Sequence, residues 1–457
     1  MTHFQSLSLC ALLIAALTPA AFSQESQQLS LQESIDIGLK SSKILHASQM
    51  RSDAAVARAS GVNTTTLPSL KFGGAYSHLS DVPPFVAAIP PGSFGGGLPQ
   101  QELSFQLSQT IVDNYGLRLT AMQPLFTGFR LSSTYNIAEN SALAATADAE
   151  RTRADLVYNI TNAYWSLYKA NDFKKVIDET IDQVNAHLTD VRNLMAQGMA
   201  TTNDVLRVEV QLSNARLQQI DAQNNVRLAT ISLNTLMGQN IATRIELRSL
   251  PDSTAADSSK VSIEEFNDLV QRALENRPEY RAMQYRVAAS DAGVTLAKSG
   301  WFPQLYLTGN YYYANPNQRY VPAKDQFNDS WDVNLTATLD IWNWGQTVHQ
   351  TNEAQAELQL TKDLMGQVKD NISLEVAQSL FNVNQAKEKI TVAAGAVRQA
   401  TENHRITNEK YKMGLMLNSD VVDAQLSLFL ARTTYTQALV DYEVALAKLS
   451  QSIGQFK

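Results

Sequence analysis

The stretch WDVNLTATLDIW, from Trp331 to Trp342, decides the fold of this chain. Apolar residues occupy every odd position, from Trp331 through Val333 to Ile341, and polar residues occupy the even positions as far as Asp340. Successive side chains of a strand point to opposite faces, so this alternation predicts a strand with one apolar and one polar face.

Three further stretches show the same alternation. It is clear over 304–313 and weaker over 68–78 and 115–126. An antiparallel sheet that covers a soluble core would explain any single strand, and a sheet that faces a bilayer would explain it too. Very long predicted helices flank each strand pair and leave little else to cover four apolar faces, which favours the bilayer. Four strands cannot close a barrel, and a bilayer tolerates no open sheet edge, so several copies must close one barrel together.

The loops between the paired strands are rich in turn residues. The segment 81–100 holds Pro83-Pro84, Pro90-Pro91 and three consecutive glycines, and 314–328 is polar with two prolines. These compositions do not favour a strand or helix, so both segments are interpreted as extracellular loops.

The chain is an internal duplication. Gly198 and Asp204 fall on Gly414 and Asp420 at one fixed offset, and Met237-Gly238-Gln239 falls on Ile453-Gly454-Gln455. A repeat of this length is too long for an ordinary solenoid and indicates a two-fold gene duplication.

Each half contains the same order of elements. A helical stretch precedes each strand pair, at about 31–59 and 263–298, and a long helical hairpin follows it. The hairpins are predicted at 131–196 with 203–236 and at 347–413 with 419–452, and their longer members would reach on the order of 100 Å. Their apolar stripes fit a coiled coil and an ordinary helical bundle equally well. The domain division is then 24–239, a linker at 240–262, and 263–457.

The first residues indicate a secretory signal. The apolar run from Leu7 to Leu17 is too short to span a bilayer and precedes small residues, which predicts a signal peptide over 1–23. A buried helix is the alternative for this run. The single cysteine, Cys10, lies inside it, so the mature chain is expected to have no thiol.

Several function classes lack support in the sequence. The net charge of -7 and the absence of a Lys/Arg cluster disfavour nucleic-acid binding. The six histidines are scattered, and no nucleophile arrangement or phosphate loop is present. We therefore expect no enzyme activity, no cofactor and no metal.

The tip of each predicted hairpin carries a recurring motif. It reads Tyr411-x-x-Gly414 followed by Asp420-Val421-Val422-Asp423-Ala424 in the second half, with Gly198 and Asp204-Val205-Leu206 in the first. On these residues, on the proline before each first strand and on the closing Gly238 and Gly454, the chain resembles the TolC-like outer-membrane efflux protein family along essentially its whole mature length.

The resemblance implies an α+β membrane protein that works as a homotrimer. Four strands per subunit would form a 12-stranded barrel in the outer membrane of a Gram-negative bacterium, and the helices would form a coiled-coil tunnel in the periplasm. It also implies a passive exit duct for efflux or type I secretion, with a periplasmic adaptor and an inner-membrane pump of the resistance-nodulation-division, ABC or major facilitator type as partners. A trimeric coiled-coil surface adhesin is the alternative, although it would not explain the strand pairs.

The resemblance also places a periplasmic gate at the tips. Asp420 and Asp423 match the acidic pair of the family's entrance, with a helix N-cap as the equal alternative for Asp420. Tyr411 and Asp204 match a hydrogen-bonded latch, which Arg207 would supplement, whereas Met416 stands where the family has a second latch residue, an arginine. The tip residues expected to contact the adaptor are Gly198, Thr202, Asn203, Val205, Gly414, Asn418, Ser419 and Val421.

Overall fold

The computed structural model describes residues 27–83, 86–90, 103–106, 111–251 and 263–456. The predicted signal peptide and the part of the linker at 252–262 lie outside these residues. The chain divides into two compact units, one made of Met1–His46, Thr152–Arg277 and Ile372–Lys457 and the other of Ala47–Arg151 and Pro278–Asn371. Each unit takes segments from both predicted repeats, so the division into 24–239 and 263–457 stays a prediction about sequence.

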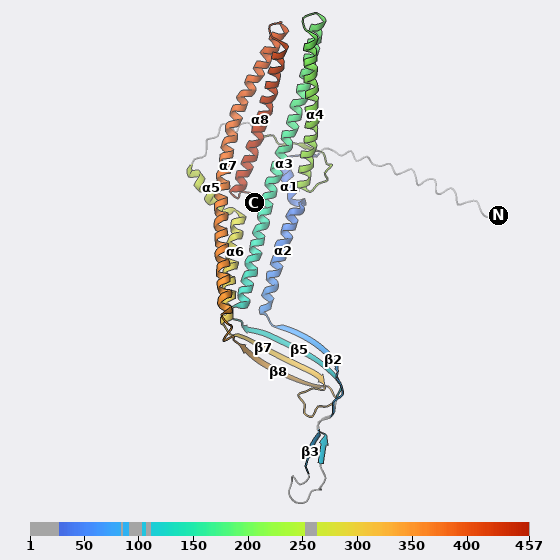
Figure 1. Cartoon of the computed structure of the whole chain (residues 1–457), viewed down its shortest axis with the longest axis vertical. Helices are drawn as coiled ribbons and strands as arrows, with labels where there is room; N and C mark the ends of the chain where they lie inside the picture. Colours follow the sequence, from blue (N-terminus) through green and yellow to red (C-terminus); the bar gives the residue numbers. More distant parts are fainter. Residues whose placement is uncertain (1–26, 84–85, 91–102, 107–110, 252–262, 457) are drawn as a thin grey trace, which may run out of the picture. The chain divides into compact units, whose positions relative to one another are not determined.

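Two helical hairpins dominate the chain (Figure 1). Helix α3 (Arg130–Ala196) returns through α4 (Thr202–Met237), and α7 (Gln346–Lys412) returns through α8 (Asn418–Ser452). Every one of these bounds lies within one residue of the predicted range. The two longer helices have 67 residues each, as a duplication requires.

The helical stretches before the strand pairs are each broken once. Helices α1 (Leu31–Ser41) and α2 (Lys43–Asn63) are separated at Ser42, and α5 (Ile263–Asn276) and α6 (Pro278–Lys298) are separated at Arg277. Each predicted helical stretch, 31–59 and 263–298, thus consists of two helices, and the first stretch extends to Asn63. The second break has a clear cause, because a proline at 278 disfavours a helical conformation at the residue before it.

Four antiparallel strands form one sheet (Figure 1). They are β2 (Ser69–His78), β5 (Asp113–Phe126), β7 (Gln304–Asn315) and β8 (Asn328–Thr338), in the order β2-β5-β7-β8. Strand β8 ends before the predicted Trp342 because its last partner is Gln304, which follows a proline that lacks an N–H to continue the ladder.

One face of this sheet is apolar and exposed in the chain. Register pairs Phe72 with Leu119, Leu119 with Tyr311 and Tyr311 with Trp331, so the apolar positions of all four strands lie on the same face. The exposed members are Leu70, Phe72, Tyr76, Tyr115, Leu117, Leu119, Leu307, Tyr311, Tyr313, Trp331, Val333 and Leu335. An apolar surface of this extent normally marks an interaction site.

The opposite face holds a polar network. Asn310 of β7 is buried, and its Oδ1 accepts hydrogen bonds from Arg118 Nη2 at 2.7 Å and Thr120 Oγ1 at 2.9 Å. Its Nδ2 donates to Asp332 Oδ1 of β8 at 2.8 Å. A single amide therefore ties the polar faces of three strands together.

The segment after β2 contains structure that the sequence did not predict. Strands β3 (Val86–Ile89) and β4 (Leu103–Gln106) pair antiparallel, with Val86 opposite Gln106. The interpretation of 81–100 as wholly irregular was therefore wrong at Val86–Ile89. This short apolar run lies between the two proline pairs and has the composition of a strand.

A core of buried side chains holds the first unit together. Tyr164, Ile160 and Leu167 of α3 pack with Leu233 and Met237 of α4. The Tyr164 hydroxyl donates to the Leu29 carbonyl at 3.1 Å, which fixes the short parallel pair β1 (Gln27–Leu29) and β6 (Ile245–Leu247) against α3.

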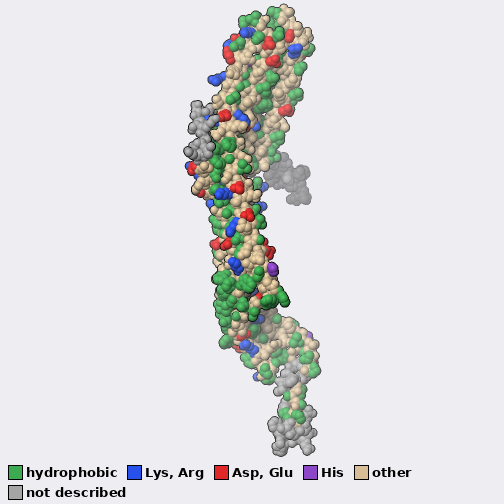
Figure 2. Space-filling view, turned by 60° about the vertical axis from the view of Figure 1, so that its left-hand side comes forward, with side chains coloured by type: hydrophobic (Ala, Val, Ile, Leu, Met, Phe, Trp, Pro, Cys, Tyr) green, Lys and Arg blue, Asp and Glu red, His purple; other side chains and the backbone are tan. Residues whose placement is uncertain are grey.

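Aromatic side chains gather in the second unit, next to the ends of the strands. Phe129 packs edge-on against both Phe126 and Phe302, and Trp342 packs edge-on against Trp344. Both tryptophans are largely exposed. Figure 2 shows hydrophobic side chains collected on the surface in this region.

Candidate functional site at the hairpin tips

The two hairpin turns have the same backbone geometry. Gly198 and Gly414 both adopt a left-handed conformation, with φ of 74° and 75°. Gly198 N donates to the Met195 carbonyl at 3.0 Å, and Gly414 N donates to the Tyr411 carbonyl at 2.9 Å. Glycine adopts this φ at little cost, and the positive φ ends each long helix and reverses the chain.

A carboxylate caps the helix that follows each turn. Asp204 Oδ2 accepts from Thr201 N at 3.0 Å and from Thr201 Oγ1 at 2.6 Å, while Thr201 Oγ1 accepts from Asp204 N at 3.2 Å. Asp420 Oδ2 accepts from Leu417 N at 3.0 Å. Asp420 thus binds the residue at the N-cap from three positions further on and is not the N-cap itself.

The charge of Asp204 is favoured by these contacts. The Thr201 hydroxyl and then the Thr201 N–H lower the pKa of Asp204 below its usual value of 3.8, and Arg207 adds to the effect. The carboxylate is therefore ionised at neutral pH. Its hydrogen bonds contribute to helix stability above pH 3.8, and this contribution is lost as pH falls through the lowered pKa.

A buried cluster beneath the turns joins all four helices of the hairpins. Val184, Leu188 and Val191 of α3 pack with residues of α4, with Tyr411 of α7 and with Val421 of α8. The ring of His187 meets the ring of Tyr411 edge-on, with 5.2 Å between centroids. His187 Nε2 lies 2.7 Å from Asn418 Oδ1, and Asn418 Nδ2 donates to the Asp204 carbonyl at 3.2 Å.

Tyr411 lies close to Asp204 without a hydrogen bond between their side chains in the described part of the chain. Burial raises the pKa of the Tyr411 hydroxyl, and the negative charges of Asp204 and Asp190 raise it further. The Asp204 carboxylate is instead bonded to Thr201. The structure therefore places the predicted latch partners near each other, and their direct bond stays a hypothesis.

Arg207 and Asp423 occupy equivalent positions of the two repeats and line one groove. The groove has a volume of about 550 Å³ and lies between α4 and α8. Both side chains are exposed, and within the described residues neither forms an ion pair. Two opposite charges, one from each repeat, are therefore exposed along this groove.

The tip residues predicted for adaptor contact divide into two groups. The exposed or half-buried positions are Gly198, Thr202, Asn203, Gly414 and Ser419. Val205, Val421 and Asn418 are buried inside the unit. The adaptor-contact proposal is therefore limited to the first group.

The sequence interpretation missed two features of the tips. One is a set of exposed apolar side chains around the turns, namely Met199, Leu206, Met413, Leu415 and Leu417. The sequence contains a signal for them, because exposed turns normally carry polar residues and these turns carry apolar ones. The other is His187, whose contact with Asn418 joins residues 231 positions apart. No local sequence pattern predicts such a contact.

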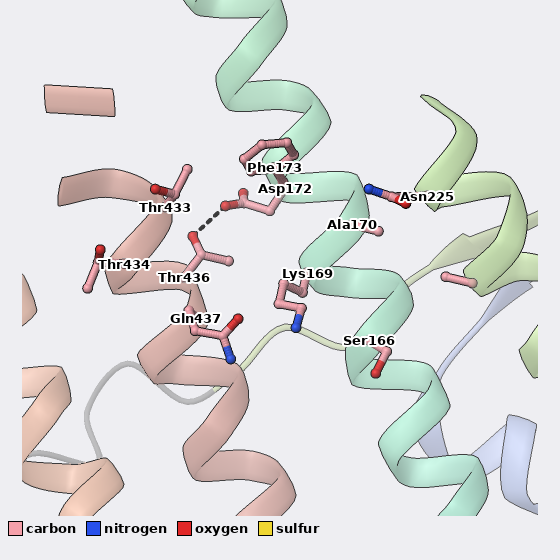
Figure 3. A pocket seen from close by; sticks show the side chains of 11 residues that line it. Ser166, Lys169, Ala170, Asp172, Phe173, Asn225, Thr433, Thr434, Thr436 and Gln437 are labelled. Carbon is pink, nitrogen blue, oxygen red and sulfur yellow. Dashed lines mark hydrogen bonds between the residues drawn. The ribbon is translucent and has the colours of Figure 1, made fainter. Parts of the chain in front are cut away.

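A second cavity, of about 600 Å³, lies between α3, α4 and α8 away from the turns. Figure 3 shows Lys169 and Gln437 pointing into the space between α3 and α8, and Thr436 donating a hydrogen bond to Asp172. The remaining lining is mainly small and polar. The lining therefore mixes charged, amide, hydroxyl and apolar side chains from three helices.

The described residues contain no group of three or more His, Cys, Asp or Glu placed to hold a metal ion. No helix among them combines the length and the apolar character needed to cross a membrane.

Comparison with known proteins gives consistent results. The TolC outer membrane protein of Vibrio cholerae is 21% identical over 320 residues, which cover 69% of this chain and 72% of that protein. The toluene efflux pump outer membrane protein TtgC of Pseudomonas putida is 22% identical over 83% of this chain and 75% of its own length. The solved structure of the outer membrane protein VceC from Vibrio cholerae superposes with a TM-score of 0.74 at 17% identity, covering 93% of this chain and 96% of that chain.

The family model described as outer membrane efflux protein matches residues 35–239 and 269–455. The match covers both helical hairpins and all four strands of the main sheet, and its two segments follow the two sequence repeats. The chain belongs to the outer membrane efflux protein family.

Proposed function

We propose that three copies of this chain close a 12-stranded barrel in the outer membrane and continue it as a helical tunnel in the periplasm. The assembly is a passive exit channel for efflux or type I secretion and performs no catalysis. It docks on a periplasmic adaptor and serves an inner-membrane pump of the resistance-nodulation-division, ABC or major facilitator type. Family membership favours this function over a surface adhesin.

The exposed apolar face of the four-stranded sheet is the observation that carries this proposal. Side chains such as Phe72, Val333 and Leu335 are more than half exposed in the single chain, at 72%, 63% and 63%. Lipid would cover this face, and the aromatic residues near the strand ends would lie at the membrane boundary. The polar network around Asn310 would then face the lumen.

The two edges of the sheet support assembly. Strands β2 and β8 each pair on one side only within the described residues. An open edge leaves N–H and C=O groups without partners, which a bilayer does not tolerate. Pairing of β8 of one copy with β2 of the next satisfies both edges and generates a ring.

Helix α4 carries a second apolar stripe that supports the same assembly. Its buried stripe includes Val205, Val208 and Leu212. A separate exposed stripe follows spacings of three, four, seven and eight residues: Leu206, Val210, Leu217, Ile220, Leu228 and Ile231. Such spacing is typical of helices that pack along their length, and a neighbouring copy would cover it.

The tips form the periplasmic entrance in this proposal. Three copies of Asp420 and Asp423 would place rings of carboxylates around it, and Tyr411, Asp204 and Arg207 would contribute to closing it. The exposed tip residues Thr202, Asn203 and Ser419, together with the two glycine turns, would meet the adaptor. Residues 1–23 would be removed on export, and 240–262 would link the two repeats.

Disulfide cross-linking tests the assembly. The predicted mature chain lacks cysteine, so introduced pairs report without background. One set joins β2 to β8, with cysteines at Phe72 and at successive positions of β8 from Trp331 to Leu335. The control pair, Leu119→Cys with Tyr311→Cys, lies directly opposed within one chain.

We expect oxidation of at least one β2–β8 pair in outer membranes to give covalent trimers on non-reducing gels. The β5–β7 control should give monomers only. The proposal is overturned if the β2–β8 pairs cross-link within single chains or produce an unlimited ladder of oligomers. Planar-bilayer recording of the purified protein tests the conduit separately, and absence of conductance would contradict it.

A further inference from the structure

His187 and Asn418 make a contact that joins the two hairpins at the tips. His187 of α3 and Asn418, the first residue of α8, retain only 7% and 6% of their surface. The 2.7 Å contact between His187 Nε2 and Asn418 Oδ1 and the 3.2 Å bond from Asn418 Nδ2 to the Asp204 carbonyl connect α8 to both helices of the other hairpin. Tyr411 of α7 packs on the His187 ring.

These partners determine which nitrogen of His187 carries the proton. The Asp204 carbonyl accepts and cannot donate, so it faces the Asn418 amide nitrogen and leaves Oδ1 to face His187. Asn418 Oδ1 also accepts only, so His187 Nε2 must donate. The neutral ring then has a bare Nδ1, which is buried and has no hydrogen-bond partner in the described structure.

A second proton on His187 would bind at Nδ1, where it would find no acceptor. Leaving a buried donor unpaired costs roughly 1–3 kcal/mol, and a buried charge costs more. The contact is therefore compatible with a neutral histidine and is strained by a charged one.

The charged and titratable groups around His187 come from all four helices. Asp190 on α3 favours the charged ring, whereas Lys412 on α7 opposes it. Asp204 on α4 and Asp420 on α8 are each held in a cap, and Tyr411 is neutral. His404 on α7 also interacts with His187, and a charge on either ring disfavours a charge on the other. Burial has the largest effect and lowers the pKa of His187 below 6.5.

The sign of the pH effect follows from this lowered pKa. When the tips open, His187 meets water and regains its ordinary affinity for a proton. Acidification below about pH 6.5 therefore favours the open tips, and the effect is complete below the lowered pKa of the closed state.

We propose that His187 and Asn418 form a proton-sensitive clasp that holds the two hairpins together at the tunnel entrance and releases them when His187 is protonated. His187 is a positioning residue, because it acts through the packing of the tips. The inference rests on the proposed function, in which the tips form the entrance. It differs from the Tyr411–Asp204 latch in its residues and in its response to acid.

Conductance of the purified full-length protein in planar bilayers at pH 7.5 and pH 5.5 tests the clasp. We expect the wild-type conductance to rise several-fold at pH 5.5. His187→Gln keeps an amide donor for Asn418 and removes the titration, so it should show the low conductance at both pH values. Asn418→Leu removes the clasp and should show the raised conductance at both.

His404 provides the matched control. It is a second histidine of the tip region, on α7, with a buried Nδ1 that also lacks a partner, and burial lowers its pKa. His404→Gln should retain an acid response, because it leaves the contact between His187 and Asn418 in place. The clasp is overturned if His187→Gln retains the response of the wild type, or if only His404→Gln abolishes it.

A distance measurement separates failure of the clasp from failure of the channel. Spin labels on Met199→Cys and Met413→Cys, both exposed at the turns, report the spacing of the tips in the detergent-solubilised protein. The distance should widen at pH 5.5 in the wild-type background and stay constant with His187→Gln. If the label distance widens at pH 5.5 but the protein conducts no current, the clasp is retained and the channel function is rejected. If the conductance rises at pH 5.5 but the label distance stays constant, the clasp is rejected.

Discussion

At the residue scale, the two tips differ in how firmly their second helix begins. Thr201 exchanges hydrogen bonds with Asp204 at the start of α4. The equivalent position of the other repeat is Leu417, which has no side-chain acceptor for Asp420. The first turn of α8 therefore has one capping hydrogen bond where α4 has three, and it should open more readily.

This difference predicts opposite effects for two substitutions. Thr201→Val removes the hydroxyl and should destabilise the start of α4 by about 1 kcal/mol. Amide hydrogen exchange in that turn should therefore be roughly fivefold faster. Leu417→Thr supplies the missing hydroxyl and should slow exchange at the start of α8 by a similar factor. Hydrogen exchange with mass spectrometry measures both.

Thr202→Val is the control for the first substitution, because Thr202 is exposed and its hydroxyl makes no hydrogen bond in the described structure. If amide hydrogen exchange at the start of α4 is equally fast in Thr201→Val and Thr202→Val, the capping argument is contradicted.

Tyr411 allows a test of the proposed latch. Tyr411→Phe keeps the ring that packs on His187 and deletes the hydroxyl. If that hydroxyl helps to hold the entrance closed, the single-channel conductance in planar bilayers should rise. Tyr411→Leu, which removes the ring as well, provides the comparison for lost packing. A closed conductance that is the same in wild type and Tyr411→Phe rules out the latch.

At the element scale, neighbouring residues of β8 should differ in their tolerance of charge. Val333 lies on the apolar face and Asn334 on the polar face. Val333→Arg would place a charge in lipid and should reduce stability in the bilayer by about 2–4 kcal/mol. Asn334→Arg should be tolerated. Denaturant titration of the protein folded in lipid vesicles measures the difference, and equal losses would mean that this face does not meet lipid.

The same elements show what sequence could predict and what it could not. The long helices were located to within one residue because a glycine ends each first helix and a capping acid begins each second one. At the break between α1 and α2, the Ser42 hydroxyl accepts the Leu45 N–H at 3.4 Å and caps α2, but a single serine within a helical pattern is a weak signal for a break. Strand β8 ends at Thr338 because the partner strand β7 begins at Gln304, although the alternation in the sequence of β8 continues beyond Thr338.

The candidate site was predictable to a similar degree. Asp204, Asp420 and the glycine turns were identified from the duplication, and their capping bonds follow from local spacing. The burial of Asn418 and its contact with His187 depend on packing between the hairpins. A pattern within either helix contains no information about that contact.

At the scale of the whole molecule, the exposed apolar tips predict a docking phenotype. Leu415 is 68% exposed at the second turn. Leu415→Glu would place a charge in a contact with the adaptor and should lower resistance to a pump substrate to nearly that of cells lacking the chain. Val321→Glu is the control, because Val321 is 92% exposed in the loop after β7.

Both variants must reach the outer membrane at normal levels for the comparison to hold. Resistance is measured as the minimal inhibitory concentration in a strain that lacks its own copy of the gene. Full resistance with Leu415→Glu would show that this side chain does not take part in docking.

The edges of β2 and β8, which have no partner strand among the described residues, also have a genetic consequence. In a ring of three, each copy completes the sheet of two neighbours, so a copy that assembles but cannot open impairs every ring that includes it. With equal expression of a normal and a defective allele, roughly one channel in eight would contain normal copies alone. Substitutions that block the entrance and leave the sheet intact should therefore be dominant over the wild type, whereas those that prevent strand pairing should be recessive.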